Sequence, residues 1–202
     1  IEHILRRHHG IEDPTFTQVR DYYNEKLHPD KIDLDNQEVY ENIFHKGKWA
    51  GVFQFTEQGA QGFCTKVKPR NIIDVSAVTS IFRPGPLSAG VDADYIEAKE
   101  HPHQIAYLSD EACEITQETF GFLIFQEQIA LLGHKLGGLT LDEGNMLRKV
   151  LTKKGTGKGG VKEKLHAKFI KGCVAKGIGR DQAQDLWDKF EFFSGYGFNK
   201  SH

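Results

Sequence analysis

Helix-breaking residues divide this chain into short segments, and this division limits the folds that it can adopt. Among 202 residues there are 21 glycines and 6 prolines, and many stand between stretches with the apolar spacing of a helix. Such interruptions are found at Gly47, Pro69, Pro84-Gly85-Pro86, Gly137-Gly138 and residues 155–160. Because proline removes a backbone donor and glycine weakens a helix interior, a helix is not expected to continue through these points. The sequence therefore predicts many short helices.

Capping residues place the individual elements. Asp13 stands before Pro14, Asp35 precedes a second apolar face, Ser109 is a plausible cap, and Thr140 and Glu143 have capping-box spacing. We expect helices at about 1–7, 14–27, 35–46, 72–82, 88–99, 110–118, 126–136, 140–152, 161–176 and 181–194. A further helix, interrupted by glycine, is expected to end at about 68. Two apolar runs, 49–55 and 121–125, are interpreted as short strands. The predicted fold class is mainly α, multi-helical with a few short strands.

The charge of the chain is distributed very unevenly. The net charge is −2, yet residues 148–180 hold eleven Lys or Arg against one acid, Glu163. A solvated helix face usually alternates Glu with Lys, and this segment does not. The pattern favours contact with a polyanion along this segment, with a solvated helix face as the alternative.

Composition excludes several other classes of protein. No apolar run reaches the length of roughly 18 residues that a membrane helix needs, and no signal-peptide pattern opens the chain, so we expect a cytoplasmic protein without membrane contact. Cys64, Cys113 and Cys173 are odd in number and far apart, which favours reduced, buried thiols over a disulfide framework or a zinc site.

No catalytic centre is evident from the motifs. The run Gly155 to Gly160 has GxGxxG spacing but follows a helix instead of a strand, and no Ser or Thr follows Lys158 as a phosphate-binding P-loop requires. Asp92 and Asp94 diverge by about 200° if they lie on a helix, which argues against a two-metal pair. We expect no metal site. Glu127 is either a polar interaction site or a charge complementing a helix dipole.

Two segments have the chemistry of phosphate binding. Arg148, Lys149, Lys153 and Lys154 concentrate positive charge at the end of an expected helix, although cations are favoured there in any case. The closing run Gly195-Tyr196-Gly197-Phe198-Asn199-Lys200-Ser201-His202 combines free backbone geometry with several donors. Because the chain opens at Ile1 without Met and stops inside this motif, we expect a piece of a larger protein.

Five ordered motifs together resemble the α subunit of bacterial DNA polymerase III, the C-family replicative polymerase. They are Gly51-Val52-Phe53-Gln54-Phe55, Phe82-Arg83-Pro84-Gly85-Pro86, Phe125-Gln126-Glu127-Gln128, Met146-Leu147-Arg148-Lys149 with Lys153-Lys154, and Gly195 to His202. The resemblance implies a fingers domain over residues 35–202, preceded by the end of the palm over 1–34. It further implies a DNA-directed DNA polymerase, a nucleotidyltransferase of DNA replication, acting in the cytoplasm of a bacterial cell, with a phage-encoded origin also open.

The resemblance also implies ligands, partners and roles. Incoming dNTP and template-primer DNA would be held here, while Mg²⁺ would be held by palm aspartates outside this chain, so that the fragment alone is expected to be inactive with no catalytic residue of its own. Further partners are the rest of the polymerase chain, palm and thumb, and other replisome subunits.

Site residues follow by position in the motifs. Arg148 and Lys149 resemble the basic pair near the triphosphate, and Tyr196 the aromatic residue near the nascent base pair. Further substrate contacts are expected from Lys153, Lys154, Asn199, Lys200, His202 and Arg83. The family usually has a second arginine at Lys149, an aspartate at Asn145 and Met-Val-Asp at Val91-Asp92-Ala93. A stand-alone helical nucleic-acid-binding module that uses residues 148–180 is the competing hypothesis.

Overall fold

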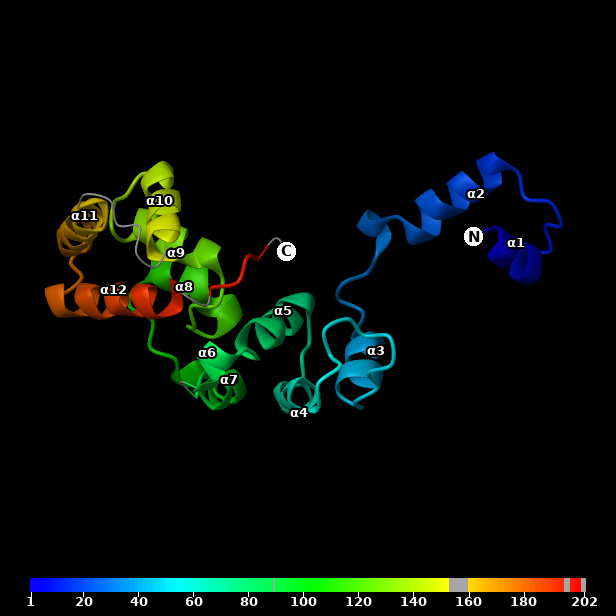
Figure 1. The fold of residues 1–202 in the computed structure, drawn as a ribbon, viewed down its shortest axis with the longest axis horizontal. Coiled ribbons are helices and arrows are strands. Elements are labelled where there is room, and N and C mark those ends of the chain that lie inside the picture. Colours follow the sequence, from blue (N-terminus) through cyan, green and yellow to red (C-terminus); the bar gives the residue numbers. More distant parts are fainter. Residues whose placement is uncertain (89, 153–159, 195–196, 201–202) are drawn as a thin grey trace. The chain divides into compact units, whose positions relative to one another are not determined.

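The computed structural model describes residues 1–88, 90–152, 160–194 and 197–200 (Figure 1). The chain divides into two compact units, residues 1–37 and 38–202. Each unit is described by itself below. The predicted site residues Lys153, Lys154, Tyr196 and His202 lie outside the described residues.

The first unit consists of short helices with little core. Helix α1 (Glu2–His9) ends at Gly10, whose φ of 68° is left-handed. Helix α2 (Phe16–Tyr22) continues into the π-helical turn η1 (Tyr23–Leu27), and the 3₁₀ turn η2 (Pro29–Lys31) follows. Within residues 1–37 only Leu5 is buried. Little apolar burial therefore stabilises this unit.

The start of α2 differs from the sequence expectation. The cap is Thr15, whose hydroxyl accepts from the Gln18 N–H while the Gln18 side chain accepts from the Thr15 N–H. Asp13 and Pro14 precede this capping box. A reciprocal box satisfies two backbone donors, which is more than a single capping side chain does.

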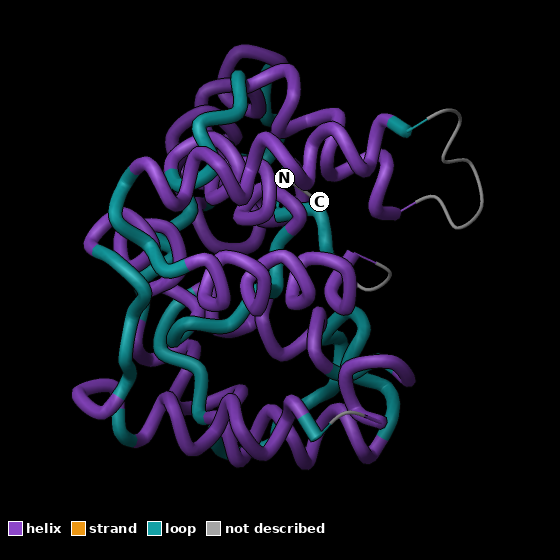
Figure 2. Tube along the Cα trace, turned by 90° about the vertical axis from the view of Figure 1, so that its left-hand side faces the viewer, coloured by secondary structure: helices purple, strands orange, loops and turns teal. Residues whose placement is uncertain are grey.

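The second unit is built almost entirely of helices and connecting turns (Figure 2). Its longer helices are α4 (Gln58–Val67), α5 (Ile72–Ile81), α7 (Val91–Glu100), α9 (Gln126–Lys135), α10 (Leu141–Thr152), α11 (Val161–Ala175) and α12 (Arg180–Ser194). The shorter elements are α3 (Gln37–Val39), which begins at the last residue of the first unit, η3 (Tyr40–Phe44), α6 (Pro84–Ser88), η4 (Pro102–Gln104), α8 (Asp110–Thr116) and η5 (Gln117–Thr119). The mainly α prediction is confirmed.

The two predicted strands are absent from the described structure. Residues 49–55 form consecutive turns, and residues 121–125 form an extended loop with one isolated bridge, between Phe125 and Phe198. An apolar run becomes a strand only when a second extended segment pairs along it, and among the described residues these runs have no pairing beyond that single bridge.

Pro84-Gly85-Pro86 begins a helix instead of preventing one. Helix α6 starts at Pro84, so both prolines lie in its first turn. In that turn the missing backbone donor has no intrahelical acceptor to lose, and proline is tolerated. The same residues that break a helix interior therefore start a helix here.

Two hydrophobic clusters form the core of the second unit. One is built around Trp187, Phe169 and Phe190 with the leucines of α9 and α10, and the other around Phe63, Val78 and Tyr95 of α4, α5 and α7. In the loop 121–125 Leu123 belongs to the first cluster, whereas Ile124 and Phe125 belong to the second. This loop therefore joins the two clusters.

Burial agrees with the expectation for two of the thiols. Cys64 and Cys173 are buried and all three cysteines are free, while Cys113 is half-buried. Burial raises the pKa of Cys64 to about 12 and that of Cys173 to about 11. In the described part of the chain no helix is both long and apolar enough to cross a membrane.

Candidate functional site

The segment 197–200 lies against the loop that leads into α9. The Phe198 N–H donates to the Ile124 carbonyl at 2.9 Å, and the Gln126 N–H donates to the Phe198 carbonyl at 2.8 Å. These two bonds form the parallel bridge between Phe125 and Phe198. The bridge brings together two of the sequence motifs, which are about 70 residues apart in the chain.

Gln128 holds the other side of the same loop. Its side chain is almost fully buried, at 2% exposure. Its amide oxygen accepts from the N–H groups of Ile124 and Phe125, at 2.9 Å each, and its amide nitrogen donates to Thr119 Oγ1 at 2.8 Å. These bonds fix the loop in an extended form that presents Phe125 to Phe198.

Helices α9 and α10 pack with their backbones close together. Gly144 faces Ala130, and a Cβ at Gly144 would lie 2.7 Å from the Ala130 carbonyl oxygen. One turn earlier on α9 stands Gln126 and one turn later on α10 stands Arg148, as expected for an antiparallel pair. Arg148 Nη1 donates to Gln126 Oε1 at 3.1 Å. The glycine therefore allows the approach that brings Arg148 to the start of α9.

Gln126 connects Arg148 to the terminal segment. While its Oε1 accepts from Arg148, its Nε2 donates to the Gly197 carbonyl at 2.9 Å. A Cβ at Gly197 would lie 2.9 Å from Gln126 Cγ, so a side chain there would displace this contact. One glutamine thus joins α9, α10 and residues 197–200.

A cavity of about 480 Å³ opens beside these contacts. Its polar lining consists of Arg148, Asn145, Asn199 and Glu127, and its apolar lining of Ala130, Leu131 and Leu141. The Glu127 carboxylate is partly engaged, because its Oε2 accepts from the Lys200 N–H at 3.1 Å. A guanidinium fork beside two amides can bind a phosphate oxygen or a polar base edge.

Glu127 serves both purposes considered for it from the sequence. It stands in the first turn of α9, where a negative charge complements the helix dipole. It also binds the terminal segment through Lys200.

Lys200 and Arg83 flank the segment 197–200. Lys200 Nζ binds both carboxylate oxygens of Glu118, at 2.6 and 2.7 Å, and lies 5.5 Å from the centre of the Phe125 ring. Arg83 Nε donates to the Ser80 carbonyl at 2.8 Å, and its guanidinium lies 5.6 Å from the centre of the Phe198 ring. Burial lowers the pKa of Arg83, although an arginine side chain stays protonated in proteins. A phosphate at Lys200 would compete with Glu118.

The structure thus brings together part of the predicted site. Arg148, Asn199, Lys200 and Arg83 gather around the Phe125–Phe198 bridge, whereas Lys149 is exposed and does not line the Arg148 cavity. Sequence reasoning placed Gln126 and Gln128 in a motif but assigned them no contacts, and it did not identify Glu118 or the role of Gly144. The signal for the glutamines was present, since both flank Glu127 at a helix start, but their partners are far away in the chain.

The basic segment is partly neutralised within the chain. On α11, Lys162 Nζ lies 2.9 Å from Glu191 of α12, and Lys168 Nζ lies 2.6 Å from Glu143 of α10. Lys176 Nζ lies 3.9 Å from Glu111. These lysines join neighbouring helices, so the polyanion interpretation applies best to the other exposed cations of the segment, such as Lys164 and Lys171.

Acidic groups do not converge into a metal site in the described ranges. No three His, Cys, Asp or Glu side chains there are placed to hold one ion. Asp92 and Asp94 both lie on α7, where residues two apart point in different directions. The expected Mg²⁺ concerns residues outside this chain and stays a prediction.

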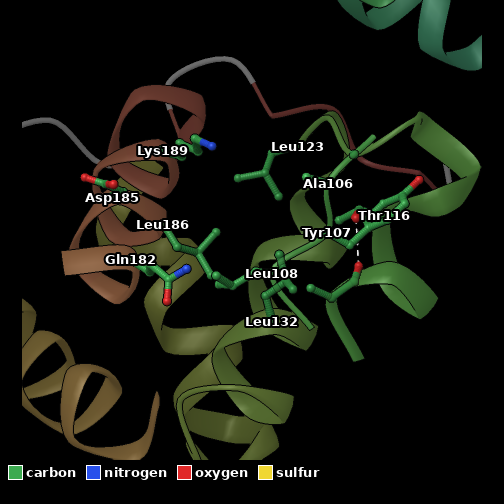
Figure 3. Close-up of a pocket in the computed structure, with 12 residues that line it drawn as sticks. Ala106, Tyr107, Leu108, Thr116, Leu123, Leu132, Gln182, Asp185, Leu186 and Lys189 are labelled. Carbon is green, nitrogen blue, oxygen red and sulfur yellow. Dashed lines mark hydrogen bonds between the residues drawn. The ribbon is translucent and has the colours of Figure 1, made fainter. Parts of the chain in front are cut away.

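Another cavity, of about 300 Å³, lies between residues 106–108, α8, α9 and α12 (Figure 3). Leu108, Leu132 and Leu186 line it, with Gln182 and Lys189 of α12 at its edge. None of the predicted site residues that the structure describes lines this cavity.

The fold and the site define a helical domain with a basic and polar crevice, and comparison with known proteins gives the family. A family model described as "Bacterial DNA polymerase III alpha subunit finger domain" matches residues 11–177. The chain therefore belongs to the family of bacterial DNA polymerase III alpha subunit finger domains, as the five motifs indicated.

Individual relatives agree. The chain is similar to the DNA polymerase III subunit alpha of Campylobacter jejuni, with 33% identity over 91% of this chain and 15% of the relative. It is similar to that of Aquifex aeolicus, with 35% identity over 85% of this chain and 14% of the relative. It is also similar to that of Pseudomonas aeruginosa, with 33% identity over 88% of this chain and 15% of the relative. The chain spans about one seventh of the length of these relatives.

Proposed function

We propose that residues 38–202 form the part of a replicative DNA-directed DNA polymerase that holds the incoming dNTP and the template-primer DNA. The observation that carries this proposal is that Gln126 is hydrogen-bonded to both Arg148 and Gly197. These bonds lie beside a cavity lined by Arg148, Asn145 and Asn199. Membership of the polymerase III alpha finger family supports it.

Arg148 binds the triphosphate in this proposal. A guanidinium offers several N–H donors in a fixed plane, and the bond to Gln126 limits its orientation. Bonds between a guanidinium and phosphate oxygens are charge-assisted and are stronger than bonds between neutral groups. Asn145 and Asn199 supply further donors from the cavity wall. By the family resemblance we also assign positive charge near the triphosphate to Lys149, Lys153 and Lys154, contact with the nascent base pair to Tyr196, and contact with phosphates to Lys200 and His202. Of these, Lys153, Lys154, Tyr196 and His202 lie outside the described residues.

Chemistry requires groups that this chain does not supply in the proposal. Mg²⁺, held by palm aspartates in the rest of a longer polymerase chain, would promote attack of the primer end on the nucleotide. The described residues of this chain hold no comparable acidic cluster. We therefore propose that the chain binds substrate, that the palm and thumb complete the enzyme with other replisome subunits, and that residues 1–202 alone incorporate no nucleotide.

The test is nucleotide binding by calorimetry with Mg-dATP, on the chain and on variants of the crevice. Arg148→Ala is expected to weaken binding by about tenfold or more, because a charge-assisted hydrogen bond contributes about 1.5–3 kcal/mol. Gln126→Leu is expected to weaken it less, since it keeps the guanidinium and removes only the hydrogen bonds of Gln126 to Arg148 and Gly197. Lys164→Ala, on the exposed face of α11, is the matched control and should bind normally.

Three outcomes would count against the proposal. Unchanged affinity in Arg148→Ala would remove the assigned role of the crevice. Primer extension by purified residues 1–202, without any palm fragment, would show that this chain contains the active site itself. If Lys164→Ala and Lys171→Ala alone abolished DNA binding, the competing hypothesis of a stand-alone basic module would be favoured instead.

A further inference from the structure

A separate cavity of about 280 Å³ is lined in part by Phe198, the residue before Asn199 of the crevice. Three aromatic side chains line it: Phe55, Phe82 and Phe198. The polar lining consists of Gln54, Thr56, Glu57, Thr79 and Arg83. Its volume of about 280 Å³ is slightly below the range of about 300–1,000 Å³ for small-molecule pockets. The cavity therefore suits one ring system rather than a whole nucleotide.

The aromatic walls are held in place before any ligand binds. Phe55 stacks on Trp49 with ring centres 5.3 Å apart and planes 9° apart. Phe82 lies directly over Gly59, where a Cβ would be 2.5 Å from the tip of the ring. Phe198 is fixed by its backbone bonds to Ile124 and Gln126. Walls that do not have to be ordered on binding favour affinity.

The backbone at the mouth of the cavity is strained. Gln54 has φ of 67°, in the left-handed region that residues other than glycine seldom adopt. The Gln61 amide holds the turn by donating to the Phe55 carbonyl at 2.8 Å. Strain of this kind tends to persist at ligand sites, where the surrounding structure maintains it.

The polar groups at the mouth match the edge of a nucleobase. The side chains of Gln54 and Glu57 are exposed and make no hydrogen bond or ion pair within the described ranges. The Thr79 hydroxyl donates to the Val75 carbonyl, which leaves its lone pairs available as acceptors. A carboxylate such as that of Glu57 accepts from exocyclic amino groups such as cytosine N4.

We propose that this cavity binds one unstacked nucleobase of single-stranded DNA, with a preference for bases that carry an exocyclic amino group. The ring lies among Phe55, Phe82 and Phe198, and its amino edge donates to Glu57. Because the Arg83 guanidinium lies over Phe198, positive charge stands beside the aromatic wall. The inference rests on the proposed function for the presence of DNA but uses residues outside the Arg148 crevice.

The test measures binding of fluorescein-labelled 12-mers to residues 1–202 by anisotropy at low salt. The probes are dC12, dT12 and an abasic 12-mer with the same phosphate backbone. We expect dC12 to bind at least about fivefold more tightly than the abasic strand, because stacking of a base on aromatic side chains has this effect or a larger one. We also expect dC12 to bind more tightly than dT12, and Glu57→Gln to remove this difference.

Two Phe→Leu variants form a matched pair. Phe82→Leu removes a wall of the cavity and should bring dC12 binding close to abasic binding. Phe53→Leu changes an 83% exposed ring outside the cavity lining and should leave the preference intact. Photocrosslinking of a 5-iodocytosine strand, mapped by mass spectrometry, should label Phe82 or Phe198.

Several outcomes would overturn the inference. Equal affinity for dC12 and the abasic strand would overturn the proposed base binding in this cavity. If Arg148→Ala still impaired Mg-dATP binding, the proposed function would stand. If Phe53→Leu, and not Phe82→Leu, abolished the preference for dC12 over the abasic strand, the base would stack on the exposed Phe53 and not in the cavity. The Glu57 side chain is exposed and not part of the fold's core. If Glu57→Gln still bound dC12 more tightly than dT12, Glu57 would not be the group that recognises the amino edge. Absence of binding to every 12-mer contradicts both this inference and the DNA-binding part of the proposed function.

Discussion

Gln128 offers the sharpest test of how the site is held, because its substitution separates hydrogen bonding from side-chain volume. The change Gln128→Leu keeps a similar size but removes the acceptor of two buried N–H groups, those of Ile124 and Phe125. Each buried donor left without a partner lowers stability by about 1–3 kcal/mol, so two give about 2–6 kcal/mol. The greater hydrophobicity of leucine offsets part of this, and we expect a net loss of about 3 kcal/mol.

Urea unfolding followed by Trp fluorescence measures this loss, because Trp187 is buried in the second unit. With a slope of about 2 kcal/mol per molar urea, the midpoint should fall by about 1.5 M. Gln117→Leu is the matched control. Gln117 is exposed, and the same substitution there should change stability by no more than about 0.5 kcal/mol.

A small effect would refute the reasoning. If Gln128→Leu lowered the midpoint by less than about 0.5 M, the two N–H groups would have found other partners, and the extended loop would not depend on this side chain. If the control lost as much stability, the effect would come from added apolar surface and not from the network.

Glycine substitutions should have opposite signs according to the space around them. Gly144→Ala should destabilise the chain by about 1–3 kcal/mol and weaken Mg-dATP binding, because the added Cβ meets the Ala130 carbonyl. Gly62 is exposed within α4 and has open space around it, so Gly62→Ala should stabilise the chain by about 0.5–1 kcal/mol in the same urea assay. At pH 8 one thiol, Cys113, should react rapidly with Ellman's reagent, whereas Cys64 and Cys173 should react only on unfolding, and rapid labelling of all three would contradict their burial. Since the folded state raises the pKa of both buried thiols, the stability they contribute should be intact below about pH 9 and should fall as the pH rises toward 12, as pH-dependent urea midpoints would measure.

Local signals in the sequence predicted most helices because their causes are local. The Ser109 hydroxyl caps α8 by accepting from Ala112, and Thr140 and Glu143 form the expected reciprocal bonds. Errors arose where two local signals compete, as at Asp13 and Thr15, or where one residue type has two uses, as for Pro84.

The strand predictions failed for a different reason. Residues 121–125 have the apolar character of a strand, but pairing depends on a second segment that the run itself does not encode. In the structure residues 197–200 supply one bridge, and Gln128 satisfies the remaining backbone groups near it.

The sequence by itself determined the helical class, most caps and breaks, and, through five ordered motifs, the polymerase III alpha finger family. It also determined that Arg148 and Lys200 are charged candidates for phosphate contact. Only the tertiary structure decided which of these residues meet. Arg148 reaches Gln126 because Gly144 lets α9 and α10 approach, and Lys200 reaches Glu118 because the chain returns to the α9 loop. Motif order records which residues are present, whereas hydrogen bonds act over about 3 Å, and residues so far apart in the chain come that close only through packing.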